Sequence, residues 1–187
     1  QIISTAATPK FLQVAPDNTR VVGVQSPGVD LIPVGQVMGA SGLNVLPCTA
    51  ATATTAGIPN ISNGPASFFD LGQGTFNPTQ LLISSDSTRA YVLTDSLPSV
   101  LVFNLASQTP SAIALAGSAV PLGASLTPDG TMMYVGASDG LVHVLDTSAG
   151  VDTGQVAFPS NTGLCIDSSG NPFPGVTCNP DLVAVRP

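Results

Sequence analysis

A short turn motif, Asp-x-Thr between two apolar runs, occurs three times and constrains the fold more than any other feature of the chain. The three copies are Asp17-Asn18-Thr19, Asp86-Ser87-Thr88 and Asp129-Gly130-Thr131. Asp favours tight turns because its carboxylate hydrogen-bonds the backbone two residues further on, and Gly because it adopts positive φ without steric cost. An apolar run of strand length follows each copy. The repeat therefore predicts a chain built from antiparallel hairpins.

The third copy is the clearest, in the stretch LTPDGTMMYVGASDGLVHVLDTSAG from Leu126 to Gly150. Its second turn, Ser-Asp-Gly, contains Asp139 and Gly140, and Asp-Gly between alternating apolar runs is a strong hairpin signal. The stretch predicts a strand that ends at Thr127 and two more at Met132–Val135 and Leu141–Leu145. In the earlier copies the corresponding strands are predicted at Phe11–Ala15, Arg20–Gln25, Val29–Val34, Arg89–Thr94 and Ser99–Asn104.

The spacing of the copies suggests a propeller-like repeat. Asp86 and Asp129 stand 43 residues apart, which is the period of a propeller blade. The interval from Asp17 to Asp86 is longer by about 26 residues. We expect this excess to be an insertion between Gly35 and Pro78, held on the sheet surface by two phenylalanines. The predicted organisation is one domain over residues 1–187, with a blade-like unit at 11–50, an insertion loop at 51–78, blades at 79–118 and 119–160, and a disulfide loop with a closing strand at 161–187.

The C-terminal end suggests that another blade begins there. Leu182 to Pro187 lines up with Phe11 to Pro16, the predicted innermost strand of the first unit. Three four-stranded units and one extra strand are fewer than the four to eight blades of a closed propeller. Since the chain begins at Gln1 rather than Met, we expect a processed or partial chain. Its open blade faces predict association with itself or with a protein partner.

Composition supports an all-β fold and excludes two classes of partner. Only 8% of residues are charged, the eleven acids are all Asp, and the good helix formers Glu and Lys are absent or nearly so. The net charge is −7, and the cations are Lys10, Arg20, Arg89 and Arg186. We therefore expect binding neither to nucleic acid nor to an anionic lipid surface. No apolar run is long enough for a transmembrane segment.

The Pro-Asp-Gly-Thr turn, the Met-Tyr-Val-Gly run, the Ser-Asp-Gly turn and Val-His-Val-Leu-Asp together resemble the YVTN-type β-propeller repeats of bacterial secreted and surface proteins. The resemblance is good over Leu126 to Thr147, moderate over Leu82 to Leu105 and weak over Phe11 to Val34. It implies blades of four antiparallel strands, and the chain would be the C-terminal blades of such a protein. The sequence departs from the pattern at Asn18 and Ser87, where the repeat has Gly.

The residues that could support catalysis have simpler structural interpretations. Gly136 to Gly140 fits the G-x-S-x-G string of hydrolases, but that motif joins a strand to a helix, whereas Ser138 lies between two predicted strands. His143, the single histidine, is expected to be a solvated or hydrogen-bonded strand residue, because the sequence offers it neither a nucleophile nor a second acid. Asp17, Asp86 and Asp129 are expected to serve their own turns. No catalytic residue is predicted.

No metal or cofactor site is predicted either. Asp167 to Asn171 has oxygen-bearing side chains at alternate positions, as calcium loops do, but the bidentate acid that should follow is missing. The cysteines show no zinc-ligand spacing. Cys165 and Cys178 flank a turn-rich loop and are predicted to form a disulfide, the alternative being two buried thiols. The state of Cys48 stays open. A disulfide would place the chain in the periplasm, outside the cell or on its surface.

Three functions remain compatible with the sequence. We favour a non-enzymatic secreted or surface propeller that acts as an interaction scaffold or as a structural subunit of a larger assembly. A propeller enzyme similar to the lactonases would need clustered ionisable residues in its central channel, and the chain has few. A module that binds glycans or other ligands would normally expose aromatic side chains, whereas Tyr91 and Tyr134 both lie in predicted strands and Trp is absent.

Overall fold

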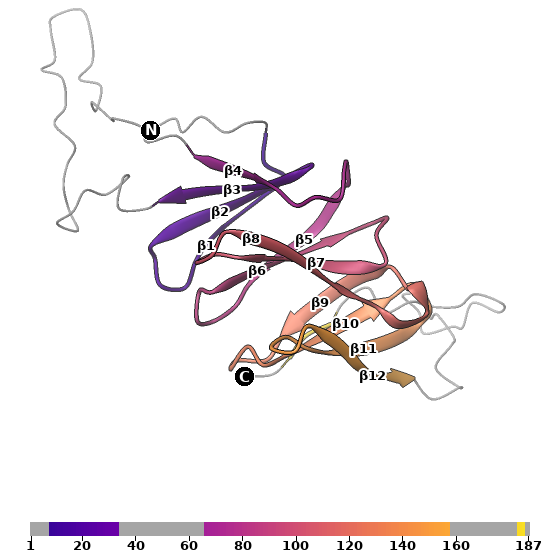
Figure 1. The fold of residues 1–187 in the computed structure, drawn as a ribbon. Helices are drawn as coiled ribbons and strands as arrows, with labels where there is room; N and C mark the ends of the chain where they lie inside the picture. Colours follow the sequence, from indigo (N-terminus) through magenta and orange to yellow (C-terminus); the bar gives the residue numbers. More distant parts are fainter. Residues whose placement is uncertain (1–7, 34–65, 158–182, 186–187) are drawn as a thin grey trace, which may run out of the picture.

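Three four-stranded antiparallel sheets make up the fold (Figure 1). The structure is a computed structural model that describes residues 8–33, 66–157 and 183–185. Within these ranges there is no α-helix. The first blade contains β1 (Phe11–Val14), β2 (Arg20–Gln25), β3 (Gly28–Pro33) and β4 (Ser67–Asp70). The second contains β5 (Pro78–Ile83), β6 (Arg89–Thr94), β7 (Ser99–Asn104) and β8 (Thr109–Ala114). The third contains β9 (Pro121–Leu126), β10 (Met132–Ala137), β11 (Leu141–Asp146) and β12 (Val151–Ala157).

The blades follow one another in chain order, as in a propeller. Each sheet is a simple meander, and the innermost strand of each blade contacts that of the next, β1 against β5 and β5 against β9. The 3-10 helix η1 (Ala116–Ser118) links the second blade to the third. Figure 1 shows the three sheets stacked in a row without closing into a ring. The all-β fold with propeller-type blades is therefore confirmed.

The two faces of the second blade are both buried, each against one neighbour. On β6, Ala90 and Val92 lie in the core shared with the first blade, while Tyr91 and Leu93 lie in the core shared with the third. Successive side chains of a strand point to opposite faces, so a strand between two blades must be apolar at every position. This is why these strands are nearly continuous apolar runs in the sequence.

The fourth strand of the first blade corrects the predicted domain boundaries. β4 lies inside the segment that we predicted to be an insertion loop, and it pairs with β3 in antiparallel register, Val29 opposite Phe69. Its Phe69 ring lies 5.2 Å from the ring of Phe103 in the second blade, measured between centroids. The insertion prediction was therefore wrong for residues 67–70. A strand of four residues far along the chain from its partner leaves little periodic signal.

The extra strand predicted at the C-terminal end is not a strand in the part that the structure describes. Val183 to Val185, the part of it that the structure describes, forms no strand. The Val185 N–H donates a hydrogen bond to Ser125 Oγ, 3.2 Å away, which places this segment beside β9, the innermost strand of the third blade. That is the place a following inner strand would take. No helix in the described ranges is long and apolar enough to cross a membrane.

Candidate functional site

The three repeat turns share one conformation and one set of hydrogen bonds. Asp17, Asp86 and Asp129 each accept hydrogen bonds from the backbone N–H and the hydroxyl of the threonine two residues further on. The residue after each Asp has positive φ, 58° at Asn18, 59° at Ser87 and 71° at Gly130. The departures from Gly at the first two copies therefore leave the turn unchanged. Each of these acids accepts hydrogen bonds within its own turn.

These contacts also set the acidity of the turn carboxyls. The backbone N–H of Thr19 is the main cause of the lowered pKa of Asp17. Side-chain hydroxyls dominate in the other copies, where Ser84 lowers the pKa of Asp86 and Thr127 lowers that of Asp129. A hydrogen bond to the ionised form favours that form. The three turn acids are therefore ionised structural groups.

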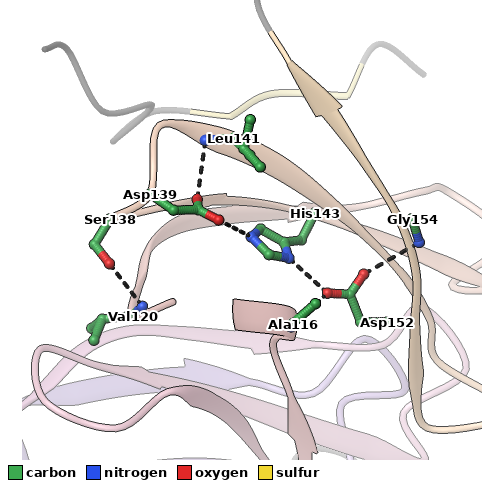
Figure 2. Close-up of polar contacts among 8 residues, drawn as sticks. All are labelled: Ala116, Val120, Ser138, Asp139, Leu141, His143, Asp152 and Gly154. Atoms are coloured by element: carbon green, nitrogen blue, oxygen red, sulfur yellow. Dashed lines mark hydrogen bonds and ion pairs between the residues drawn. The ribbon is translucent and has the colours of Figure 1, made fainter. Parts of the chain in front are cut away.

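The most unusual group of side chains is a buried cluster of His143, Asp139 and Asp152 in the third blade (Figure 2). His143 Nδ1 lies 2.6 Å from Asp152 Oδ2, and His143 Nε2 lies 3.1 Å from Asp139 Oδ2. The His143 side chain is 0% exposed, that of Asp152 7% and that of Asp139 31%. The imidazole thus lies between two carboxylates and away from water. We call these three residues the Asp–His–Asp cluster.

Three elements of the third blade supply the cluster. His143 is on β11, Asp152 is on β12, and Asp139 is in the tight turn between β10 and β11. The Asp139 Oδ1 atom accepts the Leu141 N–H at 3.1 Å, and Gly140 has φ of 82°. An Asp followed by a residue of positive φ is the expected chemistry of such a hairpin turn. The turn residues predicted from the sequence, Asp139 and Gly140, therefore also position one of the two acids.

A bulge in the β11–β12 ladder brings the second acid to the imidazole. His143 pairs with Gln155 and Val144 with Gly154, but Leu145 pairs with Asp152 because the register shifts between Val144 and Leu145. Side chains of a regular ladder alternate between the faces, so a one-residue shift moves Asp152 to the face that carries His143. The expectation that His143 has no second acid was wrong for this reason. The expectation that His143 is a hydrogen-bonded strand residue is confirmed.

The cluster also contacts the link between the second and third blades. Asp152 Oδ2 accepts a hydrogen bond from the Ala116 N–H at 2.9 Å, and Ala116 begins η1. Beside it, the Val120 N–H donates to Ser138 Oγ and the Ser138 N–H donates to the Val120 carbonyl, each at 2.9 Å. Ser138 is therefore a hairpin residue, as predicted. The cluster and Ser138 together fasten one end of the third blade to the linker.

The geometry of the Asp–His–Asp cluster is that of a structural clamp. Each ring nitrogen faces a carboxylate oxygen, so neither is directed at a hydroxyl or thiol that it could activate. The hydroxyl of Ser138, the residue before Asp139, accepts a backbone N–H. Within the described ranges, no group of three or more His, Cys, Asp or Glu side chains is arranged to hold a metal ion. The contacts shown fix the positions of turn, strand and linker.

Two polar grooves lie between the second and third blades, away from this cluster. The larger, about 370 Å³, runs between β8 and the β11–β12 turn, and the smaller, about 180 Å³, runs between the repeat turns of the two blades. Arg89 borders both, and its Nη1 donates to the Thr147 carbonyl. The side chains and backbone that line the larger groove are mostly small or hydroxyl-bearing, among them Thr109, Ser111, Thr147 and Ser148.

Several predicted features lie outside the described residues. They are the Cys165–Cys178 disulfide, Cys48, and the weak calcium-like loop that begins at Asp167. The disulfide therefore stays a prediction.

Comparison with known proteins shows the fold and no family. No protein family matches the chain, and no curated protein does. Among solved structures, the hydrazine synthase of Kuenenia stuttgartiensis is similar to 90% of this chain, with a TM-score of 0.52 and 16% identity. The structure of U3-55K is similar to 84% of this chain, with a TM-score of 0.52 and 14% identity. Both contain a β-propeller. The chain covers 42% and 41% of those two chains, so it spans less than half of their length.

Proposed function

We propose that this chain is a non-enzymatic, exported propeller segment that acts as a protein-interaction scaffold. The observation that carries the proposal is the exposed apolar surface on the outward face of the first blade. Leu12 is 61% exposed, Val14 51% and Phe68 37%. Exposed large apolar side chains on one sheet face commonly mark a surface that binds another protein.

The register of the first blade places these three side chains on one face. Leu12 and Val14 alternate along β1, and Leu12 pairs with Gly23, which pairs with Asp30, which pairs with Phe68. The opposite face packs on the second blade. In this fold the face of a blade is normally covered by another blade, as β5 covers β1. A protein partner that presents an apolar surface would complete the same kind of contact.

The opposite end of the stack carries a further pair of exposed apolar side chains. Val156 is 55% exposed and Val151 47% exposed, and both lie on β12, on the face that points away from the second blade. In the described ranges, the first blade has three exposed large apolar residues against two on β12, and two of the three are on its innermost strand. We therefore assign the principal interaction surface to Leu12, Val14 and Phe68.

The chemistry of the cluster supports a non-enzymatic function. An enzyme resembling the lactonases would need reactive groups open to substrate, whereas His143 is fully buried and both of its ring nitrogens face carboxylates. Export remains a proposal that rests on the family resemblance and on the predicted disulfide. Fractionation of the native source tests it, since recovery of the protein in the cytoplasmic fraction would contradict export.

A pair of surface variants tests the interaction surface. Chemical cross-linking in the native source should join the wild-type protein to a partner, and the double variant Leu12→Asp, Val14→Asp should lose that product. The matched control is Val156→Asp, an equally exposed valine at the other end of the stack, which should keep it. Circular dichroism establishes that each variant is folded. A product that survives the double variant and disappears in the control would overturn the assignment.

A further inference from the structure

The Asp–His–Asp cluster provides more than a static contact. We propose that it is a proton-controlled lock that holds the β10–β11 turn to the junction of the second and third blades, with His143 doubly protonated when the lock is closed. This goes beyond the scaffold function, because it makes the local stability of one end of the third blade depend on pH. It rests on the distances, burial and hydrogen-bond partners of the three residues.

The protonation state follows from counting donors. An ionised carboxylate can only accept hydrogen bonds, whereas a neutral imidazole has one N–H donor and one acceptor nitrogen. His143 has a carboxylate oxygen at each ring nitrogen, at 2.6 Å and 3.1 Å. When both acids are ionised, both contacts are hydrogen bonds only if both nitrogens carry a proton. With both acids ionised, the closed cluster is an imidazolium between two carboxylates.

The surroundings of the ring favour this charge arrangement. In the described part of the chain, the ionisable side chains that hydrogen-bond the ring are Asp139, from the β10–β11 turn, and Asp152, from β12. Val135 on β10 is the cross-strand partner of His143 and is fully buried in the apolar core, and the Ala116 N–H of η1 donates to Asp152. A positive ring buried without its carboxylates would be costly in such apolar surroundings.

The two carboxylate contacts of His143 differ in length and burial, and this difference determines which of them opens first. The Asp152 contact is the shorter one, it is nearly buried, and the Ala116 N–H holds the same Asp152 oxygen. The Asp139 contact is longer and about a third exposed. When the ring loses one proton as pH rises, the remaining proton stays on Nδ1, between the ring and Asp152. The contact between Nε2 and Asp139 then opens, because two lone pairs face each other.

Opening of the contact between Nε2 and Asp139 would also loosen the backbone of the β10–β11 turn. Asp139 also holds the Leu141 N–H, and the neighbouring Ser138 exchanges two hydrogen bonds with Val120 in the linker. If the Asp139 carboxylate turns toward water, the β10–β11 turn loses its side-chain contact with His143 on β11. The pH-dependent change is therefore expected at Asp139 to Leu141, while β12 and η1 stay joined through Asp152.

Nitrogen-15 NMR of the single histidine tests the protonation state directly. Between about pH 5 and about pH 9, the wild-type protein should show both ring nitrogens protonated at the acid end. On titration Nε2 should lose its proton while Nδ1 keeps its own. The proposal is overturned if the ring is neutral throughout this range, or if Nδ1 is the nitrogen that titrates. Because the readout needs only the wild-type chain, it does not depend on the folding of any variant.

Two matched variants test the lock itself. In Asp139→Asn the new amide can donate to an unprotonated Nε2, so the ring should be neutral and its Nε2 signal should no longer titrate. Asp146→Asn changes a turn acid on the same strand that does not contact His143, so the histidine titration should match wild type. Identical titrations in wild type and Asp139→Asn would contradict the proposal.

Amide hydrogen exchange gives the structural readout. At a pH where Nε2 of His143 has lost its proton, the amides of Gly140 and Leu141 should exchange about tenfold faster than the pH dependence of their intrinsic rates predicts. This is the effect expected for the loss of one charge-assisted hydrogen bond. The amides of Met133 and Val135 in β10 should not change. In Asp139→Asn the pH-dependent acceleration at the turn should disappear. Uniform acceleration across the third blade would instead indicate global loosening and would reject a lock confined to the turn.

Discussion

The guanidinium of Arg20 in the first blade donates a hydrogen bond from Nη1 to the carbonyl oxygen of Leu105 in the second, 2.6 Å away. Arg89, the equivalent residue of the second blade, donates to the carbonyl of Thr147 in the third. Both arginines begin the second strand of their blade, directly after the repeat turn, and both acceptors directly follow the third strand of the next blade. The third blade has Met132 at this position, so the series of blade-to-blade hydrogen bonds ends there.

Replacing Arg20 by Met, the residue found in the third blade, should destabilise the fold. The change removes a hydrogen bond from a charged donor and takes this donor away from the Leu105 carbonyl oxygen. We therefore expect the free energy of unfolding to fall by about 1–2 kcal/mol. Urea unfolding measures it. The control is Lys10→Met, which removes an exposed contact between the Lys10 ammonium and Asn77 and should cost less than about 0.5 kcal/mol. Equal effects of the two variants would contradict an inter-blade role for Arg20.

Asn18→Gly should stabilise the protein by about 0.5 kcal/mol or less, because Asn18 holds a positive φ that Gly adopts freely and its side chain is exposed. Ser87→Gly relieves the same backbone conformation, but it removes the hydroxyl that accepts the Asp17 N–H at 2.9 Å. It should therefore be neutral or destabilising. Thermal unfolding of both variants distinguishes the two effects, and a stabilising Ser87→Gly would show that the Asp17 contact contributes little.

Acid should weaken the repeat turns. The pKa values of Asp17, Asp86 and Asp129 are lowered by turn hydrogen bonds, and that of Asp146 is lowered mainly by the Ala149 N–H. A carboxyl with a lowered pKa in the folded state stabilises it at pH above its ordinary value of about 4. That contribution is lost as pH falls through the lowered value. The urea concentration at the midpoint of unfolding should therefore decrease when the pH is lowered below about 4.

The variant Asp86→Asn tests this origin of acid sensitivity. Asn keeps an acceptor oxygen for the Thr88 N–H but cannot titrate, so the acid-induced drop in the urea midpoint should be smaller than in wild type. The control is Asp95→Asn, which changes an exposed acid outside the repeat turns. If both variants lose stability in acid as steeply as wild type, the turn carboxylates are not the cause.

Gly28→Ala should disrupt the first blade. A Cβ at Gly28 would lie 2.0 Å from the carbonyl oxygen of Phe69, so β4 would have to separate from β3. We expect a loss of about 3 kcal/mol or more, the upper range for overpacking. Gly154→Ala is the matched control, since its Cβ meets nothing within 4 Å. A tolerated Gly28→Ala would show that β4 does not pair as described, and the measurement is denaturant unfolding followed by circular dichroism.

Local signals in the sequence predicted most of the fold. The Asp-x-Thr turns and the apolar alternation placed the strands that flank each turn to within two residues, because turn chemistry and side-chain periodicity are properties of adjacent residues. The hairpin assignment of Ser138 followed in the same way. β4 was missed because its partner β3 is remote in the sequence and the strand has four residues.

The candidate site was less accessible to sequence reasoning. His143, Asp139 and Gly140 were each singled out, but Asp152 was not, since its distance from His143 depends on a one-residue register shift in the β11–β12 ladder. No local pattern of residue types announces that bulge. The link from Asp152 to Ala116 likewise depends on how two blades pack.

By itself, the sequence determined the all-β class, the repeat turns and the blade-like units, because those depend on backbone propensity and on period-two burial. Only the tertiary structure decided which residues from distant strands meet. It completed the first blade with β4, directed Arg20 and Arg89 to carbonyls of the next blade, and placed His143 between two acids. The physical reason is that such contacts depend on strand register and sheet packing, which the whole core sets together.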